Sequence, residues 1–166
     1  MKPKKEKGMK SYWLRAVFLG LSAAAASLAP PALGQLKKPP YWASLSKSEA
    51  RMRTGPSSDY PANWVYRRRD LPVKVIAIYS HWRQVEDPEG TRGWMHVRLL
   101  SDQPTAIITG GTQPLRKAPE RGAPVLFRAQ AGVVGRISDC ADGWCYIDAQ
   151  GRKGFIETAH LWGPKE

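Results

Sequence analysis

The chain has 166 residues, of which 26 are lysine or arginine and 14 are aspartate or glutamate, for a formal charge of +12. The first 34 positions hold six basic residues and one acidic residue, and so account for +5 of this charge. The remaining charge is spread out, and its one dense basic run, residues 67–69, is followed at once by Asp70. Because nucleic-acid binding usually needs a concentrated basic face, we expect no nucleic-acid partner.

Residues 1–34 have the pattern of a signal peptide. A basic region ends at Arg15, an apolar run follows over 16–29, and small residues precede a predicted cut before Gln35. A membrane span needs about 20 apolar residues, so this run is too short for one. The pattern predicts export to the periplasm or the extracellular space, with no membrane span after the signal is removed. An uncleaved N-terminal anchor is the alternative.

The rest of the chain has the pattern of short β-strands. A polar, Pro-containing linker is expected at 35–40, and regular structure is expected to begin near Tyr41. Beyond it, apolar residues alternate, and Gly and Pro recur too often for long helices. Short strands with closely spaced turn signals predict an all-β barrel or sandwich.

One ground plan occurs twice, about 62 residues apart. Trp82 and Trp144 occupy the same place in the two copies, and Trp94 and Phe155 each end a Gly-x-x-Gly-aromatic hairpin. The repeat predicts two modules of one fold, at 41–102 and 103–166, and leaves little chain for a catalytic domain. Residues 105–109 could be the last strand of the first module or the first strand of the second.

The two cysteines, Cys140 and Cys145, flank an Asp-Gly turn signal. Cysteines on opposite strands of such a hairpin lie close enough to be bridged, and an exported protein permits it, so we predict a disulfide. The corresponding residues of the first copy are Ile78 and Arg83, which makes the bridge a local clip.

No motif supports catalysis, a cofactor or a metal. A disulfide sulfur cannot act as a nucleophile, and a zinc site needs about four Cys or His ligands, whereas the three histidines lie at unrelated positions of the repeat. We therefore expect a non-enzymatic protein with no catalytic residues, no cofactor and no metal ligands.

The Arg51-Met-Arg-Thr-Gly-Pro56 turn and the Gly90-x-x-Gly93-Trp94 hairpin, repeated with variations in the second copy, resemble the bacterial Src homology 3-like domain. The second copy departs from the pattern at Lys117-Ala118-Pro119 and at Phe155. The resemblance implies two small, partly open β-barrels in tandem. Relatives are usually non-catalytic, and are often attached to cell-wall hydrolases, where they bind peptidoglycan or its peptide stems.

The candidate ligand-binding residues are aromatic and basic side chains of the first copy. Barrels of this type bind peptides on aromatic rings between loops, and aromatic rings beside arginine can hold a sugar or a peptide with its carboxylates. The alternative is that Trp64 and Tyr66 fill the interface between the modules. The candidate residues are Tyr60, Trp64, Tyr66, Arg67, Arg68 and Trp94.

Two functions follow from this reading. The first is a non-catalytic envelope-binding protein that recognises peptidoglycan or its peptide stems. The second is an adaptor that binds an envelope protein and recruits or regulates a cell-wall enzyme.

Overall fold

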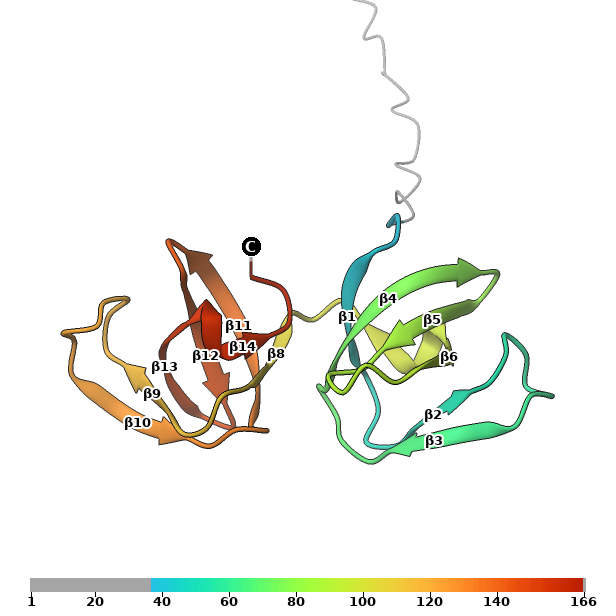
Figure 1. Ribbon diagram of the computed structural model, residues 1–166, viewed down its shortest axis with the longest axis horizontal. Helices are drawn as coiled ribbons and strands as arrows, with labels where there is room; N and C mark the ends of the chain where they lie inside the picture. The colour runs from blue at the N-terminus through green and yellow to red at the C-terminus, as the bar shows by residue number, and fades with distance from the viewer. Residues whose placement is uncertain (1–36, 166) are drawn as a thin grey trace, which may run out of the picture. The chain divides into compact units, whose positions relative to one another are not determined.

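The computed structural model describes residues 37–165. The predicted signal peptide, residues 1–34, lies outside the described residues. Those described form two seven-stranded antiparallel sheets, each curled into a small, partly open barrel, with two short 3-10 turns (Figure 1). The all-β fold predicted from the sequence is therefore confirmed. No helix within 37–165 has the length and apolar character that crossing a membrane would require.

The first sheet has the strand order β3-β2-β6-β5-β4-β1-β7. A 3-10 turn, Val97–Leu99, connects β6 to β7, which are the last two strands of the first barrel along the chain. Its strands are β1 (Tyr41–Leu45), β2 (Ala50–Arg53), β3 (Ala62–Tyr66), β4 (Pro72–Tyr79), β5 (Trp82–Glu86), β6 (Arg92–His96) and β7 (Leu100–Ser101).

The second sheet has the order β10-β9-β13-β12-β11-β8-β14, which is the same topology seven strands later. A second 3-10 turn, Thr158–His160, occupies the corresponding place. Its strands are β8 (Thr105–Ile108), β9 (Gln113–Arg116), β10 (Val125–Ala129), β11 (Val134–Ala141), β12 (Trp144–Ala149), β13 (Arg152–Glu157) and β14 (Leu161–Trp162).

The strand after the junction belongs to the second barrel. β8 pairs with β11 and β14, so the two possibilities for residues 105–109 resolve in favour of the first strand of the second copy. Trp82 and Trp144 each begin the central strand of their sheet, and Trp94 and Phe155 lie at matching positions of β6 and β13. The internal repeat is thus a repeat of structure.

The tight turns between these strands have the backbone that their residues predict. Gly90 and Gly151 have φ angles of 85° and 86°, which a residue without a Cβ adopts at little cost. The Asp142-Gly143 turn has φ angles of 49° and 81°. Two successive positive φ angles match the right-handed twist of the flanking strands and close the β11–β12 hairpin.

Each barrel encloses a core of alternating strand residues. The first centres on Leu45, Met52, Val73 and Met95, and the second on Leu115, Ile147 and Ile156, all 1% exposed or less. The first core also contains Ile107 and Val134, which belong to β8 and β11 of the second barrel. The two barrels therefore share buried apolar contacts.

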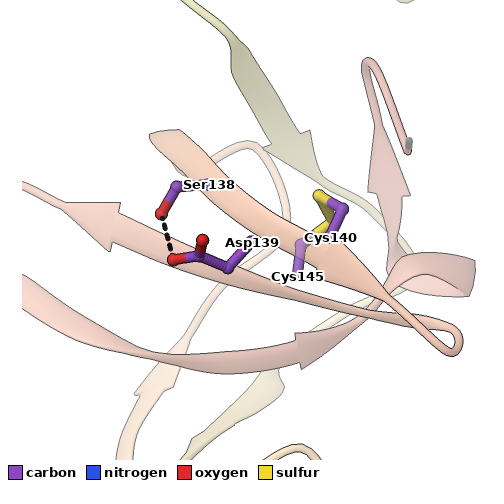
Figure 2. Close-up of a disulfide and its surroundings, with 4 residues drawn as sticks. All are labelled: Ser138, Asp139, Cys140 and Cys145. Atoms are coloured by element: carbon purple, nitrogen blue, oxygen red, sulfur yellow. Dashed lines mark hydrogen bonds between the residues drawn. A yellow bond between two sulfur atoms is a disulfide. The ribbon is translucent and has the colours of Figure 1, made fainter.

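The predicted disulfide is present. Cys140 and Cys145 are bonded, with 4.0 Å between their Cα atoms, across the two strands of the β11–β12 hairpin (Figure 2). Asp139, with a φ of 48°, lies in the interval where the register of this hairpin shifts. In the first barrel, Ile78 and Arg83 are directly paired at this place without a cross-link.

Candidate functional site

The β2–β3 loop of the first barrel, residues 54–61, is held closed by backbone and side-chain hydrogen bonds. Thr54 N donates to Pro61 O at 3.1 Å, and the Arg53 guanidinium donates to Tyr60 O. A Cβ at Gly55 would lie 2.6 Å from the Tyr60 ring, so the ring packs directly on the Gly55 backbone. Tyr60 is nevertheless 47% exposed, which presents one face of the ring to solvent.

Trp64 and Tyr66 lie side by side on β3. Their ring centroids are 6.3 Å apart, at an interplanar angle of 52°. Tyr66 is 8% exposed and belongs to the core, whereas Trp64 is 53% exposed. The buried ring of Tyr66 thus packs beside the exposed ring of Trp64. Because Trp64 is exposed, it does not fill an interface between the barrels.

The Tyr66 hydroxyl is fixed by an acidic partner. It donates to Asp87 Oδ2 at 2.7 Å. Asp87, which is 3% exposed, also accepts the backbone N–H groups of Glu89 and Thr91 at 3.1 and 2.7 Å. Burial, followed by the hydrogen bond to Asp87, raises the pKa of Tyr66. This network ties β3 to the β5–β6 turn.

Trp94 lies on the other face of the same strands. It pairs with Arg53, whereas Trp64 pairs with Met52. Because successive residues of a strand point to opposite faces, Trp94 and Trp64 do not share one surface. The half-buried Trp94 lies opposite Arg53 on the neighbouring strand, near the base of the 54–61 loop.

The arginines that follow β3 are exposed. Arg67 lies 3.9 Å from Glu49 and is otherwise free to reach solvent. Arg68 lines two adjoining hollows of about 500 and 520 Å³, which we call the basic groove. The groove brings three arginines of the second barrel next to the predicted run. Its arginines are Arg67, Arg68, Arg69, Arg128, Arg136 and Arg152.

Sequence reasoning missed Arg128, Arg136 and Arg152. They lie on three different strands, β10, β11 and β13, so no local run of charge marks them. The only signal was the excess of basic over acidic residues, and that does not say where the charges meet.

Comparison with known protein families identifies the family of this chain. A model described as "Bacterial SH3 domain" matches residues 46–102 and 109–163, more than half of the chain and one match for each barrel. The chain belongs to the bacterial SH3 domain family. The resemblance noted in the sequence is therefore confirmed, in two tandem copies.

Two solved structures from Trichomonas vaginalis are similar to this tandem SH3 protein. They are the structures of NlpC1, at 15% identity with a TM-score of 0.34, and of NlpC2, at 14% identity with a TM-score of 0.35. The matches cover 75% and 76% of this chain but 46% and 49% of those chains, so the protein spans about half their length. A search of curated proteins gave no match.

The second SH3 domain has the same scaffold with a different surface. Arg116 donates to Ala123 O at 2.8 Å, as Arg53 does to Tyr60 O, and Lys117 N closes the loop on Pro124 O at 2.9 Å. The loop closure is therefore preserved despite the departures from the family pattern. Ala123 is only 3% exposed, so the second domain lacks the exposed loop aromatic of the first.

The counterpart of Trp64 in the second domain is Phe127. Phe127 pairs with Leu115 as Trp64 pairs with Met52, and it is 39% exposed. The two exposed rings occupy equivalent edge positions but have different neighbours: Tyr66 beside Trp64, and the lining of the basic groove around Phe127. The two domains thus present different side chains around the same edge position.

Proposed function

We propose that this tandem SH3 protein is a non-catalytic envelope-binding protein whose first domain recognises peptidoglycan through its peptide stems. Bacterial SH3 domains often bind cell-wall components. The observation that carries the proposal is the pair of exposed rings, Tyr60 and Trp64, on the loop-bearing edge of the first domain. The second domain has Ala123 and Phe127 at these positions.

Each aromatic residue has a separate task in this proposal. Tyr60 and Trp64 contact the ligand, since an exposed ring offers a flat apolar face to a peptide or a sugar. Tyr66 positions Trp64 from the core, and Trp94 supports Arg53 at the base of the loop. The pre-formed loop limits the entropy lost on binding.

Arg67 and Arg68 supply charge to the same ligand. Peptide stems carry carboxylates, and the planar guanidinium donates two parallel hydrogen bonds to such a group. Both arginines follow directly after β3, the strand of Trp64, so a peptide lying along this strand reaches them with its charged end.

The export proposed for the protein agrees with its disulfide. A Cys140–Cys145 bond persists in oxidising compartments such as the periplasm and is rare in the cytosol. We therefore propose a periplasmic or extracellular location.

One observation favours the alternative function of a protein–protein adaptor. β10 is an edge strand of the second sheet, and three consecutive apolar side chains on it, Val125, Leu126 and Phe127, are 39–47% exposed. An exposed apolar edge strand can accept an extended segment of a partner protein through main-chain hydrogen bonds.

The deciding experiment is co-sedimentation of the purified protein with insoluble peptidoglycan. Wild-type protein is expected in the pellet, and Trp64→Ala is expected to remain in the supernatant, because the variant loses the main exposed ring. Tyr79→Ala is the matched control, since Tyr79 is also an exposed aromatic, at 61%, but lies at the tip of the β4–β5 hairpin.

Equal retention of Trp64→Ala and Tyr79→Ala would contradict the assigned site. Absence of wild-type protein from the pellet would contradict peptidoglycan as the ligand and favour the adaptor. In that case, a Leu126→Glu change on β10 should abolish capture of the protein partner.

A further inference from the structure

The basic groove contains more positive charge than its own acids can neutralise. Six arginines line it, against two acids, Asp70 and Asp148. Asp70 is engaged by Arg136 at 3.2 Å and by Arg69 at 3.9 Å. Asp148 accepts Gly151 N at 2.7 Å and pairs with Lys153 at 3.4 Å. Both carboxylates are therefore already satisfied.

Three arginines of the groove remain available. Within residues 37–165, Arg68, Arg128 and Arg152 have no carboxylate within 4.0 Å, and all three side chains are exposed. Unpaired cations gathered in a concave surface raise the local positive potential and attract anionic ligands. The groove is thus suited to carboxylate or phosphate groups.

The groove also offers an apolar wall. Phe127 and the half-buried Val133 line the larger hollow. A half-exposed aromatic ring next to arginine can pack against a sugar ring while the guanidinium holds its acidic group. The two hollows share Arg68, Val134 and Gln150, so they are continuous, and each has the volume of a small-ligand site, about 300–1,000 Å³.

One exposed ion pair and one buried apolar contact join the two sides of the groove. The Arg136–Asp70 ion pair joins β11 to the segment that follows the arginine run. Val134, on the same strand, packs in the core of the first domain. Arg68 is therefore held near Arg128 and Arg152, and the groove exists only when both domains are present.

We propose that the basic groove binds a linear, negatively charged glycan. Arg68, Arg128 and Arg152 pair with its carboxylate or phosphate groups, and one sugar ring packs on Phe127. Two continuous hollows with separated cations and a single aromatic ring match a repeating acidic sugar better than a nucleic acid, which would need several rings for base stacking. The groove shares Arg67 and Arg68 with the proposed peptide-stem site, but Trp64 and Tyr60 do not line it, so a Trp64 variant distinguishes the two sites.

The test measures binding of the full-length protein by calorimetry at several salt concentrations. The probes are a galacturonate oligomer, which carries carboxylates, a sugar-phosphate oligomer, which carries phosphates, and a neutral N-acetylglucosamine oligomer. At least one acidic probe is expected to bind, with affinity that falls as salt rises, and the neutral probe is not. The acidic probe that binds more tightly identifies the group that the groove prefers.

Charge reversal locates the site. Arg128→Glu with Arg152→Glu should weaken binding of the acidic probe by about tenfold or more, because charge-assisted hydrogen bonds are replaced by repulsion. Lys47→Glu with Arg98→Glu makes the same change of charge at exposed positions outside the groove and should weaken it by about twofold at most. Trp64→Ala should bind the acidic probe as wild type does, which separates this site from the peptide-stem site.

Equal weakening by the two charge-reversed variants would overturn the proposal, because the attraction would then come from net charge alone. Tighter binding of single-stranded DNA than of either acidic oligomer would overturn the assignment to a glycan. If the groove variant fails to fold, chemical-shift mapping of the acidic probe on the wild-type protein tests the location of the site instead. Shifts at Gly135 and Gly151 support the groove, and shifts confined to other residues refute it.

Discussion

The Tyr66 hydroxyl and Asp87 form a buried hydrogen bond that joins the third strand of the first domain to its β5–β6 turn. The bond is 2.7 Å long, and Asp87 accepts two backbone N–H groups as well. This network therefore holds β3 in place, and β3 carries Trp64, the exposed ring next to Tyr66.

Removing this hydroxyl should destabilise the protein. Tyr66→Phe leaves a buried carboxylate oxygen without its donor, and we expect the free energy of unfolding to fall by about 1–3 kcal/mol. Urea denaturation measures it. Tyr60→Phe is the control, since Tyr60 is exposed and that change should be nearly neutral. Equal stability of the two variants would show that the bond contributes little.

The same residue predicts a loss of stability in alkali. An unfolded tyrosine has a pKa of about 10, and burial together with the hydrogen bond to Asp87 raises the pKa of Tyr66 in the folded protein. The unfolded chain therefore releases this proton first, so the contribution is complete below pH 10 and declines as pH rises above it. Stability should fall more steeply between pH 10 and 11.5 for wild type than for Tyr66→Phe. Parallel curves would contradict the coupling.

Gly93 should not tolerate a side chain. A Cβ there would lie 2.5 Å from Met52 Cγ and 2.9 Å from Arg53 O, because β2 crosses closely over β6. Gly93→Ala is expected to cost about 1–3 kcal/mol through overpacking, measured by thermal or urea unfolding. Gly122→Ala, where a Cβ meets nothing within 4 Å, should change stability by about 0.5 kcal/mol or less. A neutral Gly93→Ala would mean that β2 shifts freely.

Reducing the disulfide should weaken the second domain without unfolding it. The Cys140–Cys145 bond closes a short loop, so its loss should cost about 2 kcal/mol in the chain-entropy model. Comparing urea unfolding with and without a thiol reductant measures this. The Cys140→Ala variant should show no difference between the two conditions. Two titratable thiols in the unreduced, exported protein would show that the disulfide is absent in solution.

Much of the fold could be read from local sequence. Alternating apolar residues, the Asp142-Gly143 turn and the glycines at 90 and 151 act over a few residues, so strands, hairpins and the repeat were predictable. The disulfide was predictable for the same reason, since its cysteines lie five residues apart in one hairpin. The surface was only partly readable. The closeness of Trp64 and Tyr66 follows from alternation, but the burial of Tyr66 depends on Asp87, 21 residues away.

The sequence by itself determined the secondary structure and the doubling of the fold, because both rest on short-range patterns. Only the tertiary structure decided which charges meet. Arg68, Arg128 and Arg152 come from segments separated by up to 84 residues, and they become neighbours because Val134 packs in the first domain and Arg136 pairs with Asp70. Trp94 and Trp64, in contrast, lie in one sheet but do not meet, because their side chains point to opposite faces. Contacts of this kind depend on how strands curl and pack, which no local pattern of residues encodes.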